Sequence, residues 1–487
     1  MTTPSSDPIS ADRIRVAVIG GGITGLAAAQ RLVSGSDQVH VTIFEASQRL
    51  GGHIRTEDAD GFLLELGPDS FITNKPAGLQ LCKEIGFTNQ LIPTDVRFRR
   101  SLVLRNGRPM AVPDGFMLMA PARPWAILST PVLSLPGKMR LLAEAIIPRR
   151  HAGDDESLAS FVRRRFGRQA LERLVQPLVG GIYTSDPEKL SLKATMPRFL
   201  DMEQSHGSVI RATMAQQKSD DSAGSSTGSG ARYGLFVTAR KGLGDLVSSL
   251  EAWLRKNERV RIQLGCPVRE VAPAVDSATG WNLTLAKKVT SETFDAVVVT
   301  QPTHIAAAMM KHSSLALLAS LLQSIEYASS AIVVSGHRLS DFRYPMEAFG
   351  IVVPSIENRK VLAISFSSRK FPDRAPEGQI LLRTFVGGAM QPELLQMDND
   401  SMITMVNQEL KSIFGMSDEP MFSEVMRYDK AMPQYHVGHL DLVAKIETAQ
   451  SRLPGLFLAG SSYHGVGIPD SIASGQKAAD SILASLA

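Results

Sequence analysis

A glycine-rich turn near the N-terminus constrains the fold more than any other feature of this chain. The apolar segment Arg15–Ile19 predicts a short buried strand that runs directly into Gly20-x-Gly22-x-x-Gly25. An alanine-rich helix and a second strand, Val39–Phe44, are expected to follow, and Glu45 ends that strand. In this context the glycines permit a tight turn, close backbone approach to a pyrophosphate, and packing of helix against strand. The segment therefore predicts a dinucleotide-binding site.

Two further glycine turns indicate which dinucleotide binds. The helix N-terminus would face the phosphates, and the Glu45 carboxylate would accept hydrogen bonds from ribose hydroxyls and repel a 2′-phosphate, which disfavours NADP. The segments RLGG, Arg49–Gly52, and ELGPDSF, Glu65–Phe71, offer two more close turns. Nicotinamide-dependent enzymes do not usually need such turns. They favour a longer ligand that several parts of the chain contact.

The C-terminal segment Gly460–Gln476, GSSYHGVGIPDSIASGQ, is unusually rich in glycine for a chain end. Chain ends are normally where disorder concentrates, so this turn indicates that something must approach it closely. A final helix is expected to start near Asp470 or Ser471. Its apolar face should carry Ile472, Ala479 and Ile482.

Composition excludes several classes of protein. Of the 487 residues, 44% are hydrophobic and 21% charged, which is typical of a globular protein, and the formal charge of +4 is too small to indicate nucleic-acid binding. Cys82 and Cys266 match no metal-ligand spacing, and no histidine pair does so with a third ligand, so no metal site is expected. The polar first ten residues do not resemble a secretory signal, and no apolar run is long enough for a spanning helix.

Two internal segments differ from the rest. Val112–Ile147 is apolar but interrupted by five prolines. It is either a cluster of short helices around a second core or a surface that dips into one membrane leaflet, where Arg149 and Arg150 would suit anionic headgroups. Gln216–Gly230 is rich in Ser, Gly and Asp and is expected to be a mobile surface loop. Several β-rich runs between Ala331 and Gly388 suggest one sheet with long excursions.

These motifs carry a family resemblance. VIGGGITGL, FEA, RLGG and ELGP, together with the terminal LAGSSYHGVGIPDSIASG, resemble the FAD-binding superfamily of amine oxidases and porphyrinogen oxidases. FPDRAP and AMPQYHVGH are more specific and look like the protoporphyrinogen and coproporphyrinogen III oxidase family, over about 15–484. The resemblance implies an α/β and α+β fold. A discontinuous Rossmann-like FAD domain (12–85, 206–303 and 447–487) would carry a helical membrane-binding domain (86–205) and a mixed-sheet substrate domain (304–446).

The resemblance also assigns the cofactor site. It implies that the terminal turn packs against the flavin, with the last helix pointing its N-terminus at the pyrimidine ring, and that Val268 clasps the adenine. The two cysteines lie outside the terminal motif, so FAD should be noncovalent. The expected cofactor residues are Gly20, Gly21, Gly22, Thr24, Gly25, Glu45, Ala46, Arg49, Gly51, Gly52, Gly67, Pro68, Asp69, Ser70, Val268, Gly460, Val466, Gly467 and Ile468.

For the chemistry, the family implies little acid–base work by side chains. A hydride would leave a bridging carbon of a porphyrinogen for the flavin, an N–H proton would be lost, and molecular oxygen would reoxidise the flavin and yield hydrogen peroxide. No catalytic side chain is assigned. Phe366 and Val352 are expected on opposite walls of the substrate site, with Val334 a looser candidate, although each of them could equally be a core residue. Lys75 and Arg100 are candidates for binding a propionate; each could equally be a solvated surface cation.

Some alternatives stay open. An amine oxidase on the same fold, for which Tyr428 and Tyr463 could form the aromatic pair, and a noncatalytic flavoprotein are the rival functions. Whether the substrate is protoporphyrinogen IX or coproporphyrinogen III is undecided. The expected location is the inner face of the cytoplasmic membrane, with peripheral attachment through residues 113–147. Other enzymes of haem synthesis and a second copy of the chain are open as partners; nucleic acid is not expected.

Overall fold

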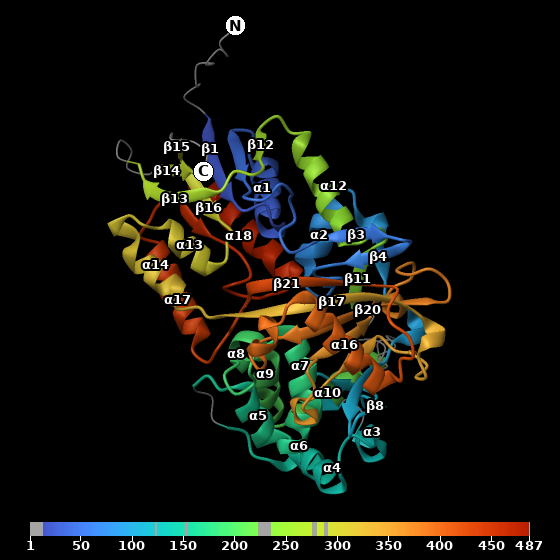
Figure 1. Ribbon diagram of the computed structural model, residues 1–487. Helices are drawn as coiled ribbons and strands as arrows, with labels where there is room; N and C mark the ends of the chain where they lie inside the picture. Colours follow the sequence, from blue (N-terminus) through green and yellow to red (C-terminus); the bar gives the residue numbers. More distant parts are fainter. Residues whose placement is uncertain are drawn as a thin grey trace.

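A five-stranded parallel sheet forms the upper part of the molecule in Figure 1. The computed structural model describes residues 13–121, 124–150, 154–222, 235–274, 280–286 and 291–486. The strand order is β12 (Val260–Gln263), β2 (Val39–Phe44), β1 (Ile14–Ile19), β16 (Ala296–Val299) and β22 (Leu456–Leu458). The sheet thus gathers strands from widely separated parts of the chain. A three-stranded antiparallel sheet, β13 (Val268–Pro273), β14 (Trp281–Leu285) and β15 (Ser291–Phe294), lies beside it.

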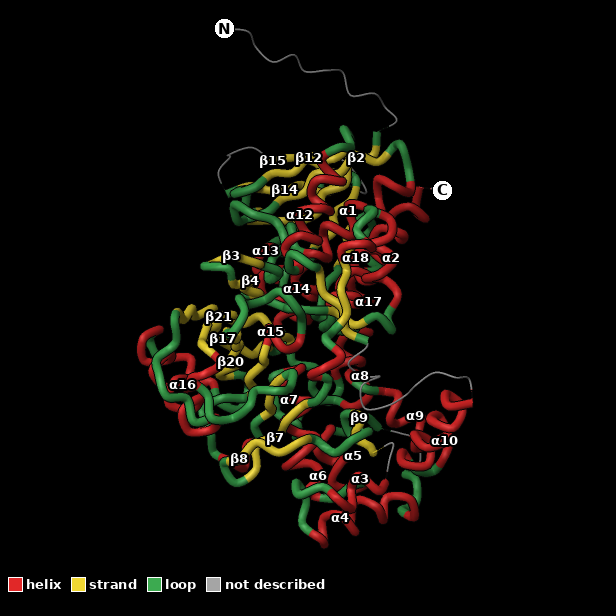
Figure 2. The backbone as a smooth tube through the Cα atoms, turned by 90° about the vertical axis from the view of Figure 1, so that its right-hand side faces the viewer, coloured by secondary structure: helices red, strands yellow, loops and turns green. Residues whose placement is uncertain are grey.

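A seven-stranded mixed sheet crosses the middle of the molecule (Figure 1). Its order is β21 (Phe422–Pro433), β17 (Tyr327–Arg338), β20 (Gln379–Gly387), β19 (Ala363–Phe366), β18 (Gly350–Val352), β7 (Ser101–Arg105) and β8 (Arg108–Ala111). The long helix α16 (Asn399–Phe414) packs on one face (Figure 2). The strands β7 and β8 belong to this sheet, although the predicted boundary at residue 86 assigns them to the helical region.

Short helices form the lower part (Figures 1 and 2): α3 (Pro124–Ser129), α4 (Leu135–Leu142), α5 (Leu158–Arg165), α6 (Arg168–Ala170), α7 (Gln176–Tyr183), α8 (Leu192–Thr195), α9 (Pro197–His206) and α10 (Val209–Ser222). A buried ion pair joins Arg165 and Glu144, whose side chains are fully buried. Glu144 also accepts hydrogen bonds from the Val209 and Ile210 amides, at 2.9 and 3.1 Å, and so fixes the start of α10.

That fixed start explains an error in the sequence analysis. The expected mobile loop 216–230 begins inside α10, which continues to Ser222; the remainder, 223–230, lies outside the described residues. Once a helix has been nucleated, each added residue gains one hydrogen bond at low cost, so a polar tail can extend it. Composition alone gave the wrong state for residues 216–222.

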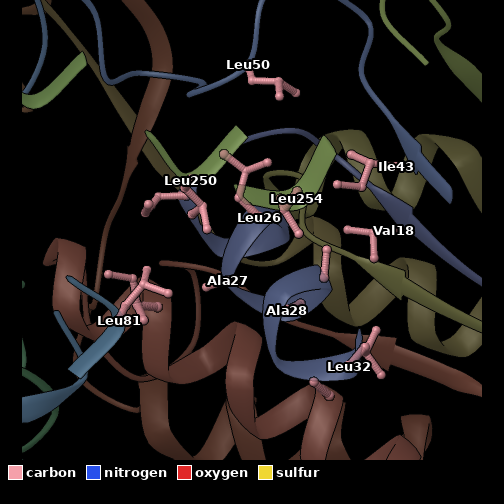
Figure 3. Close-up of a cluster of buried hydrophobic side chains, with 14 of the residues drawn as sticks. Val18, Leu26, Ala27, Ala28, Leu32, Ile43, Leu50, Leu81, Leu250 and Leu254 are labelled. Atoms are coloured by element: carbon pink, nitrogen blue, oxygen red, sulfur yellow. The ribbon is translucent and has the colours of Figure 1, made fainter. Parts of the chain in front are cut away.

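The largest core cluster lies between the parallel sheet and its covering helices (Figure 3). Leu26 and Leu32 of α1 (Ile23–Gly35) meet Val18 of β1, Leu81 of α2 (Pro76–Glu84) and Leu254 of α12 (Leu243–Arg255). The final helix, α18 (Ile468–Leu486), packs against α1, and its Ile472, Ala479 and Ile482 are buried as expected. It begins slightly before the expected start at Asp470 or Ser471.

Glycine allows the backbones of α18 and α1 to come into direct contact where the two helices cross. A Cβ built on Gly475 would lie 2.2 Å from the Thr24 carbonyl oxygen, and one on Gly35 would lie 2.3 Å from a Leu483 methyl carbon. Real Cβ atoms do not approach backbone oxygens so closely. The two ends of the chain are therefore held together by a contact that tolerates no side chain at Gly475.

We predict that Gly475→Ala lowers the free energy of unfolding by about 1–3 kcal/mol, because the helices must separate to admit one methyl group. Urea unfolding would measure it. The matched control is Gly181→Ala, also within a helix, where an added Cβ meets nothing within 4 Å. This control should be neutral or slightly stabilising. Equal effects of the two substitutions would contradict the prediction.

Candidate cofactor and substrate site

The first glycine turn forms the start of the site. Gly20 has a φ of +117°, and a Cβ on Gly25 would lie 2.0 Å from the Gly20 carbonyl oxygen, so the turn and the helix–strand packing both require glycine. Gly22 differs: a Cβ there meets nothing within 4 Å. It is the N-cap of α1, and no side chain caps this helix. The helix start therefore presents free space and unsatisfied amides, which suits a phosphate group.

Glu45 and Arg49 organise the edge of this turn. The Gly21 and Ser47 amides donate to the Glu45 carboxylate, at 2.7 and 2.8 Å. Arg49 donates to the backbone oxygens of Ile54, at 3.0 Å, and Gly52, at 2.6 Å, and so shapes the RLGG segment. That segment approaches the helix start closely, since Gly51 forms a β-bridge with Gly22. Six predicted cofactor positions, Gly21, Gly22, Glu45, Arg49, Gly51 and Gly52, are thereby brought together.

The Val268 segment reaches the same edge. The Gly265 amide donates to the Ser47 carbonyl at 2.7 Å, and the Cys266 amide donates to the Glu45 carbonyl at 2.8 Å. Val268 itself begins β13 and is partly buried. Ala46 is exposed between these contacts, whereas Thr24 is buried in α1. The Gly265 and Cys266 contacts hold the segment that leads into Val268 beside Glu45, and the role of Val268 toward adenine stays a prediction.

The third turn, ELGPDS, is tied to the seven-stranded sheet. Gly67 must be glycine, because a Cβ would lie 1.8 Å from the His53 carbonyl oxygen. Asp69 pairs with Lys370, at 2.9 Å, and with Arg383 of β20, at 3.1 Å. Burial alone would raise the pKa of Asp69, but these two cations hold that pKa below its usual range. The Asp69 carboxylate is therefore ionised. Its two cations connect the ELGPDS turn to the seven-stranded sheet.

Ser70 and Pro68 flank this ion cluster. The Ser70 hydroxyl donates to Asp69 at 2.7 Å and accepts from Lys370 at 3.0 Å. Arg383 also donates to the Gly67 carbonyl. Arg383 and Lys370 were not predicted from the sequence. A single arginine inside the apolar strand ILLRTFVG was the available signal, since a buried guanidinium requires a partner.

The terminal turn is held by aromatic side chains. The Tyr435 hydroxyl donates to the Ser461 carbonyl at 2.6 Å and accepts from the Gly465 amide at 2.8 Å. His439 stacks on Tyr435 with ring centroids 3.9 Å apart. Burial lowers the pKa of His439 to about 4, so its Nε2–H donates to the Tyr463 carbonyl, at 3.0 Å, as a neutral imidazole. The motif AMPQYHVGH therefore supports the turn.

The rest of this turn lies where α18 begins. The Gly460 amide donates to Ser474 at 2.9 Å, and Ile468 is the first residue of the helix. The Gly467 amide donates to Asp470 at 3.3 Å, and Val466 packs against the helical region. A Cβ on Gly460 would meet only the Thr300 carbonyl oxygen, at 3.8 Å, so this position is open to a flat ligand, whereas one on Gly467 would lie 3.0 Å from the Asp470 carboxylate.

The two propionate candidates have different surroundings. Lys75 contacts Asp470, in the first turn of α18, at 2.6 Å, and so lies beside the terminal turn. Arg100 pairs with Glu347 at 3.0 Å, and both side chains are more than half exposed. Their roles toward a substrate stay predictions. Of the two, Lys75 lies closer in the fold to the predicted cofactor residues of the terminal turn, because its partner Asp470 also accepts from the Gly467 amide.

The apolar candidates do not share one face of the large sheet. Phe366 has no exposed surface; it packs edge-on against Phe414 of α16, with ring centroids 5.5 Å apart. Val334 is fully buried on the opposite face, which carries Arg383. Val352 is half-buried and borders the helical region. Phe366 therefore lies in the core and cannot form an opposite wall to Val352.

Phe385 of β20 takes the position that the sequence analysis gave to Phe366. It is half-buried and lies between Ile332 of β17 and Ala363 of β19. Strand alternation puts it on the same face as Arg383, two residues away, and Val352 continues that face through its pairing with Ala363. An incompletely covered apolar surface therefore extends from the ion cluster toward the helices.

We predict that Gly22→Ala weakens FAD binding at least tenfold while the stability of the apoprotein changes little. The methyl group would fill the space over the α1 N-terminus but touch no protein atom. FAD titration and thermal unfolding of the apoprotein measure the two effects. Gly25→Ala should instead destabilise the apoprotein, because its methyl group meets the Gly20 carbonyl. Unchanged FAD affinity in Gly22→Ala would exclude the N-terminus of α1 as the phosphate-binding position.

Comparisons with known proteins agree with this geometry. The model of the flavin-containing amine oxidoreductase family matches residues 23–483. A solved structure from Exiguobacterium sp. 255-15 with a provisional protoporphyrinogen oxidase assignment has a TM-score of 0.84 and 28% identity; the match covers 98% of this chain and all of that one. Putrescine oxidase, at 16% identity and a TM-score of 0.64, shares the fold.

Curated relatives span nearly the whole chain. Coproporphyrinogen III oxidase from Bacillus subtilis is 34% identical, over 96% of this chain and 97% of the relative. Mitochondrial protoporphyrinogen oxidase from Nicotiana tabacum is 29% identical, over 97% and 95%. The expected family and cofactor are confirmed, and the glycine turns fit the cofactor: the chain belongs to the flavin-containing amine oxidoreductase family and uses FAD.

Proposed function

We propose that this protein oxidises a porphyrinogen to a porphyrin in haem synthesis, using molecular oxygen and releasing hydrogen peroxide. The similarity to porphyrinogen oxidases over nearly the whole chain carries the proposal. Coproporphyrinogen III is the favoured substrate, since relatives with that name are 34%, 30% and 33% identical, against 29–30% for those named protoporphyrinogen oxidase. Protoporphyrinogen IX is the second candidate.

The chain's own residues would bind and orient the macrocycle. FAD, when bound, supplies the hydride acceptor. The apolar surface with Phe385 and Val352 suits a flat macrocycle, while Lys75 beside the terminal turn could hold a propionate. Asp69 is already neutralised by Lys370 and Arg383, so it offers no obvious base. Binding and exclusion of water therefore remain the protein's main contributions.

Peripheral membrane attachment through residues 113–147 is part of the proposal. Trp125 of α3, Leu135 of α4 and Ile146 are 80%, 69% and 78% exposed. Large apolar side chains exposed on neighbouring short helices favour contact with a lipid surface. Among the described residues, no helix has the length and hydropathy required to cross a bilayer. We propose the inner face of the cytoplasmic membrane as the location.

An aerobic assay tests the oxidase reaction. Purified protein with FAD should convert coproporphyrinogen III to fluorescent porphyrin faster than protoporphyrinogen IX, with oxygen consumed and peroxide formed. Acid precipitation should release the flavin, as expected for noncovalent FAD. Oxidation of amines without oxidation of either porphyrinogen would favour the amine oxidase alternative. Porphyrin formation without peroxide would refute oxygen as the acceptor.

A pair of substitutions tests the proposed substrate surface. Phe385→Ala should lower kcat/KM for the porphyrinogen at least tenfold with little change in unfolding temperature, because the ring is only half-buried. Phe366→Ala removes a fully buried ring and should cost about 3–5 kcal/mol of stability. Steady-state kinetics and urea unfolding separate the two. The surface is misassigned if Phe385→Ala has normal kinetics.

A further inference from the structure

A cluster of arginines lies away from the cofactor site, at the edge of the seven-stranded sheet. The strands β7 and β8 are joined by a two-residue turn, Asn106-Gly107, whose φ angles of 50° and 72° are those of a tight hairpin. Arg105 and Arg108 flank the turn as a directly paired cross-strand couple. Like charges in that position destabilise a sheet. The hairpin thus holds two cations together at a cost.

A third arginine approaches from the helical region. Arg173 lies in the π-helical turn Leu171–Val175, which packs against β7, and it donates to the Val132 carbonyl at 3.3 Å. Burial and then repulsion from Arg173 lower the pKa of Arg105. Short π-helical turns are rare and are frequent at functional sites. Two separate elements therefore converge on one cationic patch.

Within the described residues these cations form no close ion pairs, although the nearby Glu357 carboxylate acts to raise the pKa of Arg105. In the described part of the chain, no carboxylate oxygen lies within 4.0 Å of a guanidinium nitrogen of Arg105, Arg108 or Arg173. The Nε atoms of Arg105 and Arg173 are buried without a hydrogen-bond partner. Glu357 is the nearby acid, but its two oxygens accept from the Asn106 and Gly107 amides, at 2.8 and 3.0 Å. Unsatisfied guanidinium groups of this kind favour an external oxyanion.

A cavity of about 350 Å³ opens at this cluster. It is lined by Arg105, Asn106, Arg108, Met110 and Pro131. Pro131 lies in the connection between α3 and α4, the helices that carry the exposed Trp125, Leu128, Leu135 and Met139. The connection between these two helices therefore forms part of the cavity wall.

We propose that Arg105 and Arg108, which line this cavity, form a binding site for a phosphate group, with Arg173 adjoining them from the π-helical turn, and that this site is separate from the FAD and porphyrinogen sites. The guanidinium fork matches the oxygens of a phosphate, and an oxyanion would relieve the repulsion between the three cations. The adjoining apolar helices favour the phosphate of a phospholipid headgroup as the source. A free phosphate compound has the same chemistry and is the other source to be distinguished.

The test compares Arg105→Gln/Arg173→Gln with a control of equal charge, Arg211→Gln/Arg261→Gln. The control arginines are exposed and lie outside the cavity. Two ligands are used with the FAD-loaded protein: inorganic phosphate, followed by calorimetry and by the rise in unfolding temperature, and vesicles of phosphatidylcholine with or without phosphatidylglycerol, followed by flotation. Wild type should bind phosphate and prefer the anionic vesicles.

The site variant should lose phosphate binding and bind anionic vesicles about fivefold more weakly per arginine removed, relative to the control. If it loses only phosphate binding, the site stands and a free phosphate compound is its ligand. If it matches the control with both ligands, the proposal is overturned. Arg108→Gln is a second variant should the first unfold. If Arg105 and Arg108 repel each other, Arg108→Gln should not lower the unfolding temperature. A lower unfolding temperature would therefore contradict the proposed repulsion.

Discussion

The backbone contact between α1 and α18 is the constraint on which the cofactor site depends. Gly475 lets the final helix lie against the Thr24 carbonyl, and this brings the terminal turn beside the first glycine turn, from the other end of the chain. The strand β22, which precedes the terminal turn, pairs with β16 in the same sheet as β1. A long dinucleotide can therefore be enclosed by both ends of the chain. The glycine density at the C-terminus follows from this approach.

A second set of interactions connects the FAD side to the large sheet. Asp69 on the ELGPDS turn is held by Lys370 and Arg383, while Tyr428 of β21 donates to the Leu66 carbonyl. Tyr435 and His439 hold the terminal turn in a comparable way. Replacing one member of a buried ion cluster leaves an uncompensated charge, which typically costs several kcal/mol. The ELGPDS turn of the predicted cofactor site is therefore fixed to the seven-stranded sheet, which carries the proposed substrate surface.

Much of this could be predicted from sequence because it is local. The strand–turn–helix unit, Glu45, and the apolar face of the last helix follow from spacing and periodicity within short segments. The partners of Asp69 could not be predicted, because Arg383 is 314 residues further along the chain and strand pairing decides where it points. The assignment of Phe366 to the substrate site was wrong for a related reason. A one-residue change of register exchanges the faces of a strand, so the sequence AISF does not reveal which side α16 covers.

The helical region shows the same limit. Its apolar sequence with five prolines left two alternatives open, short helices around a core or a membrane-facing surface, because the exposure of Trp125 and Ile146 depends on how the helices pack. The arginine cavity needed the β7–β8 hairpin and the π-helical turn in contact, although Asn106-Gly107 between two arginines is visible in the sequence as a hairpin turn. Local patterns predicted the elements, and long-range packing determined the sites.

Anaerobic mixing of the FAD-loaded protein with coproporphyrinogen III tests the central claim most directly. The flavin absorbance should bleach in a single phase that depends on substrate concentration, and admission of oxygen should restore it. That result would show electron transfer from a porphyrinogen to the flavin that the two glycine turns enclose. A fully loaded protein whose flavin stays oxidised with both coproporphyrinogen III and protoporphyrinogen IX would contradict the account.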